Sequence, residues 1–389
     1  MRIDHGRRVG VVPRLHTSTL VEAERNHAVH KKLAPSLIAF AFLPLTAIAE
    51  EPAKPAPPPK WYDTIEIHGL VDAYYSANAT QLQTQPNLLR TFDSANGFQI
   101  AYGKLIAQAP PAPVGFRIDL GFGPVAQLTT FDHLQQAYVS VKLPGEIILD
   151  GGRFVTNAGA EVIEAKDDWI YSRSLLFSFA IPFTHTGLRA TIPIPGIAGL
   201  SAMAGLFNGF DQPTGVPGSG VTNKVGSPKM GHLALMYSGP ANTTVTLNGY
   251  YGYTDATQAD TKTLLDGVVG RSFADLSLNL NADYGRQSGK QYWGLAGMAR
   301  YSFFDDKFRI SGRGEYFDDS DGAAGITNAA GARLLNKYWE GTLSLSVPAS
   351  PNAEFRVEGR YDRTTDAKIF KDGVEQGQGT VQVAALAWF

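Results

Sequence analysis

Residues 355–362, Phe355-Arg-Val-Glu-Gly-Arg-Tyr-Asp362, alternate without exception between an uncharged and a charged residue. Successive side chains of a β-strand point to opposite faces of the sheet, so one face of this stretch is charged and the other is not. The same period of two recurs at 308–316 and at 65–75. The sequence therefore predicts β-strands that have one apolar and one polar face.

Two all-β architectures fit this alternation. In a β-sandwich the apolar faces of two sheets pack against each other and the polar faces meet water. In a membrane-spanning barrel the apolar face meets lipid and the polar face lines the interior. The periodicity alone does not choose between them.

The connections between strands favour the barrel. About sixteen strands can be placed, and every second connection is compact, as at Pro144-Gly145, whereas most of those between are longer. The longest are 77–96, 157–182, 208–230 and 318–336. Turns at one end and loops at the other are typical of an up-and-down antiparallel transmembrane β-barrel. Because 197–207 lacks a polar face and 263–270 is a weak strand, fourteen and eighteen strands are alternatives to sixteen.

Composition excludes several classes of function. The chain has 389 residues, a formal net charge of -2 and no basic block, which argues against nucleic-acid binding. It has no cysteine, so disulfides, thiol catalysis and cysteine-ligated metals are excluded. The histidines have no metal-ligand spacing, and we expect neither a metal nor another cofactor.

The N-terminal region predicts export. Residues 31–49 begin with two lysines, continue through an apolar run and end in Ala47-Ile-Ala49, the order of a cleaved signal peptide. We therefore assign 1–49 to an N-terminal extension with its signal core at 31–49, 50–60 to a proline-rich tether, and 61–389 to the barrel. This organisation predicts an exported protein whose mature chain is the barrel.

Aromatic residues gather near the predicted strand ends, as in the two interfacial girdles of outer-membrane barrels. The set near the short turns is Trp61, Tyr62, Phe273, Phe303, Phe304, Phe308 and Trp388, and the set near the long loops is Tyr251, Tyr253, Tyr284, Tyr292, Trp293, Tyr316, Tyr338 and Trp339. The last strand alternates and finishes at Phe389, which is similar to the terminal-Phe signal read by the outer-membrane assembly machinery.

A more specific resemblance lies between 134 and 187. Its motifs are Leu134-Gln-Gln-Ala-Tyr-Val139, Gly152-Arg-Phe-Val-Thr156 with Gly159 and Glu161, Tyr171-Ser-Arg-Ser174, and His185-Thr-Gly187. Together they resemble the OmpL-like family of β-barrel porins. The resemblance implies a Gram-negative outer-membrane pore and supplies no substrate.

The third long connection, 157–182, is the candidate pore constriction. It carries the acidic side chains Glu161, Glu164, Asp167 and Asp168, and helical spacing would place Glu161, Glu164 and Asp168 on one side. Resemblance to general porins implies that this loop folds into the lumen and faces arginines of the wall. The wall candidates are Arg117, Arg153, Arg189, Arg309, Arg313, Arg356 and Arg360. A solvated outer loop is the alternative.

These features predict a porin through which small hydrophilic solutes and ions diffuse passively. The alternatives are a solute-selective channel, for example for sugars, and a non-transporting adhesin or barrel enzyme. No catalytic constellation is convincing, and His185 with Ser172 or Ser174 is the least weak Ser–His candidate. The expected partners are outer-membrane lipid, the assembly machinery, the solutes and other copies of the chain.

Overall fold

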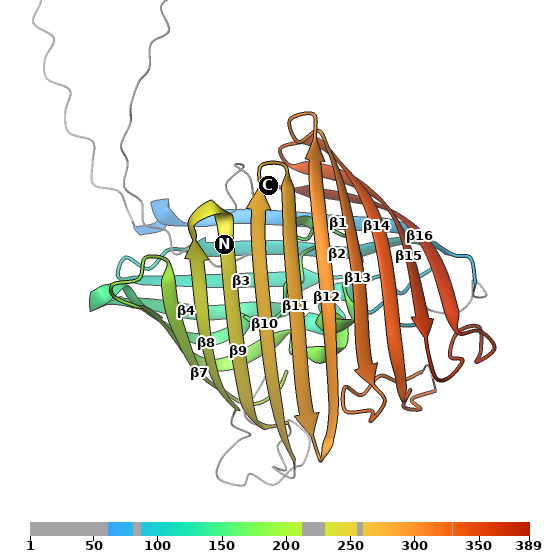
Figure 1. The fold of residues 1–389 in the computed structure, drawn as a ribbon. Helices are drawn as coiled ribbons and strands as arrows, with labels where there is room; N and C mark the ends of the chain where they lie inside the picture. Colours follow the sequence, from blue (N-terminus) through green and yellow to red (C-terminus); the bar gives the residue numbers. More distant parts are fainter. Residues whose placement is uncertain (1–60, 81–86, 212–229, 255–259, 329) are drawn as a thin grey trace, which may run out of the picture.

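The computed structural model describes residues 61–80, 87–211, 230–254, 260–328 and 330–389, and within them sixteen strands form one closed antiparallel barrel (Figure 1). Each strand pairs with its neighbours in sequence, and β1 closes the wall by pairing with β16, from Leu70↔Trp388 to Asn78↔Thr380. The predicted up-and-down barrel of sixteen strands is confirmed.

The strands are β1 (Glu66–Asn78), β2 (Gly97–Ala109), β3 (Val114–Phe122), β4 (Leu134–Leu143), β5 (Ile147–Val155), β6 (Thr184–Pro193), β7 (Leu200–Phe207), β8 (Met230–Gly239), β9 (Thr243–Tyr253), β10 (Thr261–Phe273), β11 (Leu276–Gln287), β12 (Lys290–Phe303), β13 (Phe308–Asp319), β14 (Asn336–Ser350), β15 (Ala353–Thr364) and β16 (Gly377–Trp388). The helical segments are short: η1 (Trp61–Thr64), α1 (Pro124–Thr129), η2 (Pro144–Glu146), η3 (Ala165–Asp167), η4 (Leu176–Ala180) and η5 (Pro240–Asn242).

The two faces of the wall are inverted relative to a soluble protein. On β15, Phe355 and Val357 are 51% and 49% exposed, whereas Arg356 and Glu358 are each 2% exposed. A sandwich would bury the apolar residues and expose the charges. The alternation therefore places the apolar face outside, where it meets lipid, and the charged face inside.

The connections separate as the sequence predicted. Compact turns such as η2 and η5 lie at one end of the barrel, which we call the turn side, and the long connections lie at the other, the loop side. The two strands with weak patterns both form: β7 is shorter than its predicted range and β10 is longer. β10 keeps its register with β9 and β11 because its outward Leu265 and Val269 fall in the apolar rows of both neighbours.

The aromatic girdles are present with three corrections. Trp388 of the turn-side set has the inward parity of β16 and packs against the buried interior cluster, so its assignment to the girdle is wrong. Trp293, Trp339 and Tyr251 are exposed on the loop side of the outer face. Tyr292 and Tyr338, which the sequence assigned to this girdle, are fully buried instead. They point inward because they occupy the opposite parity to Trp293 and Trp339, so their assignment to the girdle is wrong.

The predicted extension and signal, 1–49, and the tether, 50–60, lie outside the described residues. Among the described residues, no helix is long and apolar enough to cross a membrane.

Candidate functional site

The segment between β5 and β6, residues 157–182, touches side chains from widely separated strands. The Gly159 N–H donates to Asp266 on β10 over 3.1 Å, whereas the Tyr171 hydroxyl donates to Asp72 on β1 over 2.6 Å. The Tyr171 N–H donates to Glu358 on β15 over 2.9 Å. Since β1 and β10 lie far apart around the wall, one segment joins distant parts of the barrel.

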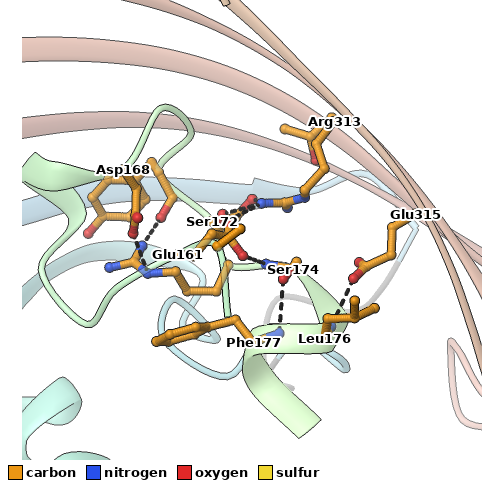
Figure 2. Close-up of polar contacts among 12 residues, drawn as sticks. Glu161, Asp168, Ser172, Ser174, Leu176, Phe177, Arg313 and Glu315 are labelled. Carbon is orange, nitrogen blue, oxygen red and sulfur yellow. Dashed lines mark hydrogen bonds and ion pairs between the residues drawn. The ribbon is translucent and has the colours of Figure 1, made fainter. Parts of the chain in front are cut away.

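The central contact is an ion pair between this segment and β13. The Arg313 Nη1 lies 2.7 Å from the Glu161 Oε1 and also donates to the Ser172 carbonyl oxygen over 2.8 Å. The other side of the guanidinium pairs with Glu340 of β14, with Nε 2.9 Å from Oε2. Figure 2 shows Arg313 extending from its strand toward Glu161 and Ser172. All donors of this buried guanidinium therefore have oxygen partners, as a buried charge requires.

Glu315, two residues further along β13, holds the start of η4. Its two carboxylate oxygens accept the N–H groups of Leu175 and Leu176 over 2.7 and 2.8 Å (Figure 2). Ser174 adds to the same end, because its hydroxyl oxygen accepts the Phe177 N–H over 2.9 Å. These N–H groups have no partner within the helical turn, so the carboxylate of the wall replaces a cap.

Arginines of β15 donate to the backbone of the same segment. Arg356 Nη1 donates to the Ala165 carbonyl oxygen over 2.8 Å, and Arg360 Nη1 donates to the Arg173 carbonyl oxygen over 2.6 Å. Each arginine also pairs with a neighbouring carboxylate, Glu354 and Asp362 respectively. The strand thus contributes donors and acceptors alternately to the segment.

Glu164 joins the segment to β2, five strands around the wall from β13. Its carboxylate forms an ion pair with the Lys104 ammonium on β2, which also lies 2.7 Å from Asp119 on β3. Burial would raise the pKa of Glu164, but the Lys104 ammonium holds that pKa below its usual range. Glu161 and Glu164 therefore reach two different parts of the wall.

The other two acidic residues pair within the segment. The Asp167 carboxylate lies 2.7 Å from the Lys166 ammonium, and the Asp168 carboxylate lies 2.9 Å from the Arg173 Nε. Burial, together with the nearby Glu161 charge, raises the pKa of Asp168 well above its usual range. The expected helical spacing is wrong, because only η3, Ala165–Asp167, is helical here and residues 160–164 are irregular.

The remaining wall arginines have partners on the wall itself. Arg117 pairs with Asp119 over 2.8 Å, Arg189 with Asp150 over 2.8 Å, and Arg309 with Glu354 over 2.7 Å. Arg153 differs, because it is buried and donates to the Thr184 hydroxyl over 2.9 Å without an ion pair among the described residues. Of the seven predicted wall arginines, Arg313, Arg356 and Arg360 hydrogen-bond to segment 157–182.

Sequence reasoning missed the first long connection, which contributes to the same network. Arg90 forms an ion pair with Asp93 and donates to Gln382 on β16 over 2.9 Å. Phe92 packs on Phe177 of η4, with ring centroids 5.5 Å apart. The sequence shows that the connection 77–96 is long, but no motif in it indicates a contact with the interior of the barrel.

The interior also contains a stack of rings along β6 to β9. His185 stacks on Phe207 with centroids 4.3 Å apart, and His232 stacks on Tyr250 with centroids 4.2 Å apart. His185 lies 3.3 Å from the Thr156 hydroxyl, whereas Ser172 and Ser174 bond to other groups, so the described residues form no Ser–His pair. Nor does any group of three or more metal-ligating side chains occur in the part of the chain that the structure describes.

Comparison of the fold finds outer-membrane proteins of about the same length. OmpT of Vibrio cholerae, in a trimer form, aligns with a TM-score of 0.55 at 11% identity over 84% of this chain and 99% of that chain. OprB of Pseudomonas putida gives 0.56 at 11% over 84% and 94%, and the channel DcaP of Acinetobacter baumannii gives 0.54 at 13% over 84% and 97%. At these identities the likeness concerns the fold.

No curated protein matches the chain in sequence. A family model does match, over residues 64–389, which is the whole barrel, and its description is "Putative beta-barrel porin-2, OmpL-like". Together with the closed barrel and its charged interior, this match shows that the chain belongs to the OmpL-like family of outer-membrane β-barrel porins.

Proposed function

We propose that this porin conducts small hydrophilic solutes and ions through an aqueous passage that segment 157–182 narrows. The observation that carries the proposal is the pair of contacts that Glu161 and Glu164 make with Arg313 and Lys104, on different parts of the wall. Because the segment is attached to the wall at both places, it narrows the open cross-section of the barrel between them. The acidic residues Glu161, Glu164, Asp167 and Asp168 then form the constriction.

Transport by such a pore is passive. Solutes move down their gradients, and the width of the passage and the field of its charges decide the rate. Carboxylates of the segment are ion-paired with cationic side chains of the wall, so a permeating ion passes beside these paired charges. Porin family and barrel fold indicate a channel without enzymatic activity.

A sugar channel that uses an aromatic surface has less support. The rings of His185, Phe207, His232 and Tyr250 are each at most 3% exposed, because they stack on one another. A solute needs an open ring face in order to stack on it. The diffusion pore is therefore the preferred function.

Export to the outer membrane completes the proposal. We infer cleavage after Ala49, and sequencing the N-terminus of the mature protein tests it. The family and the fold support the outer membrane as the destination. A homo-oligomer is proposed by analogy with the trimer form of the OmpT neighbour.

The reversal potential in a salt gradient tests the constriction. Replacing Glu161 and Glu164 with glutamine leaves Arg313 and Lys104 without those partners, so the reversal potential should shift toward anions. The shift should shrink in high salt, since the Debye length falls from about 10 Å at 0.1 M to about 3 Å at 1 M.

A matched control is Glu146→Gln, which removes a carboxylate at an exposed turn where it pairs with Lys142. The control should leave the reversal potential unchanged. The proposed constriction is wrong if the double variant behaves like this control at low salt.

A further inference from the structure

The outer face of the barrel has a depression over β14, β15 and β16. Its volume is about 590 Å³, and its outward lining residues include Gly341, Leu343, Gly359, Tyr361 and Val381. The lining also includes Ala79, just past the end of β1, and an inward-facing register row across β13 to β16, made of Arg313, Thr342, Arg360 and Thr380. Because the side chains of this row point inward, strand backbone forms the floor. The depression therefore opens toward lipid and not toward the pore.

Outward glycines create this depression. Gly341, Gly359 and Gly379 each have open space where a Cβ would stand, with no atom within 4 Å of it. Because a glycine leaves the backbone uncovered, a neighbouring molecule can approach the strand closely. Around the glycines, Leu343, Tyr361 and Val381 are 63%, 52% and 57% exposed. The result is a shallow groove with apolar edges that fits a hydrocarbon chain.

Two basic side chains stand above the groove on the loop side. Arg363 lies two residues beyond Tyr361 on the same face of β15 and is exposed. Lys337, near the start of β14, also projects outward. Neither forms an ion pair among the described residues, although Asp318 is the cross-strand neighbour of Lys337. Unpaired cations at the edge of the hydrocarbon zone attract anionic headgroups.

Aromatic rings lie at the level of Arg363, and Lys337 lies two residues further toward the loop side on β14. Trp339 is the register partner of Arg363, and its ring lies 4.6 Å from that of Tyr316, centroid to centroid. Amphipathic rings of this kind occupy the headgroup level of a membrane. From the loop side downward, the surface thus presents Lys337, then Arg363 beside the rings of Trp339 and Tyr316, and then the uncovered apolar groove.

We propose that this surface binds a phosphate-bearing lipid of the outer leaflet, with its phosphate at Arg363 and Lys337 and an acyl chain along Gly341, Gly359 and Gly379. The charge favours this occupant over a second copy of the chain. A lipid carries its phosphate directly above its acyl chains. The barrel surface matches this arrangement, because its cations lie above its apolar groove.

Native mass spectrometry of the full-length barrel provides the test. The protein is reconstituted in phosphatidylcholine nanodiscs that contain either phosphorylated lipid A or the same lipid without its phosphates, and the retained lipid is counted. Wild type should retain the phosphorylated form preferentially. Arg363→Gln with Lys337→Gln should weaken retention by about fivefold for each charge removed. Gly359→Leu, which fills the groove, should also reduce retention.

Two variants serve as matched controls and should retain lipid as wild type does. Arg286→Gln removes an exposed basic residue of β11, away from the groove. Gly103→Leu fills an open glycine position on β2. Equal retention of both lipids, or loss caused equally by Arg286→Gln, would overturn phosphate recognition at this surface. A change of oligomeric mass in Gly359→Leu without loss of lipid would show a subunit interface and also overturn the proposal.

Discussion

Glu161 and Arg313 stand 152 positions apart in the chain, yet their side chains meet at 2.7 Å between the third long connection and β13. Their side chains are 4% and 0% exposed. Charges so deeply buried are stable only with partners, and Glu340 and the Ser172 carbonyl oxygen complete the set around the guanidinium. The contact determines where segment 157–182 lies relative to the wall.

Removing one partner of this pair should destabilise the barrel strongly. Arg313→Gln leaves Glu161 buried without its cation and leaves Glu340 with Arg360 alone, and breaking a buried pair in this way costs about 3–5 kcal/mol. Glu161→Gln should cost less, because Glu340 still pairs with Arg313. Urea unfolding of the refolded barrel in detergent micelles measures both variants and the double variant. Strictly additive effects would show that the two side chains do not interact.

The ion pair between Glu164 and Lys104 predicts a pH dependence. Because folding lowers the pKa of Glu164, its ionised form stabilises the folded state. That stabilisation is complete above the unfolded pKa, about 4.3, and is lost as pH falls through the lower folded pKa. The difference in unfolding temperature between wild type and Glu164→Gln should therefore shrink on acidification below about pH 4.3. A difference that stays constant with pH contradicts this role of Glu164.

The sequence predicted the wall well and the interior only in part. Strand number, closure and the inverted faces follow from period-two alternation and from the segregation of turns and loops, because both are local patterns. The partners of Glu161 and Arg90 depend on contacts between residues far apart in the chain, which no local pattern encodes. The helical expectation for 160–169 failed because side chains, such as Arg173 at the Val162 and Ile163 carbonyl oxygens, satisfy its backbone in place of helical bonds.

Cysteine labelling tests the assignment of faces on β13. The chain has no native cysteine, so single substitutions have no background. Ile310→Cys should react with a lipid-soluble maleimide and Arg309→Cys with a water-soluble one, because Ile310 is exposed on the outer face and Arg309 pairs with the inward Glu354. A one-residue slip in register would turn arginine side chains toward the hydrocarbon, which costs about 2–4 kcal/mol for an arginine at the bilayer midplane. The reverse labelling pattern would contradict the register.

Deletion of Phe389 should affect assembly more than conduction. Its side chain is exposed at the turn side, and its backbone N–H donates to the Gly69 carbonyl oxygen over 3.1 Å. The other pairs of β1 with β16 remain without it. Pulse-chase assembly in cells should slow, while the conductance of each inserted channel should stay unchanged. Assembly at the wild-type rate would remove the support for a terminal signal.

Planar-bilayer recording of the purified, full-length protein tests the central claim, that the barrel is an aqueous pore narrowed by segment 157–182. Heat-modifiable electrophoretic mobility first establishes that the protein is folded. The account predicts discrete conductance steps for wild type and larger or noisier steps for Arg313→Gln, whose segment loses its ion pair with β13 and keeps only the Glu315 contacts to that strand. Folded wild-type protein that inserts and gives no steps would contradict it.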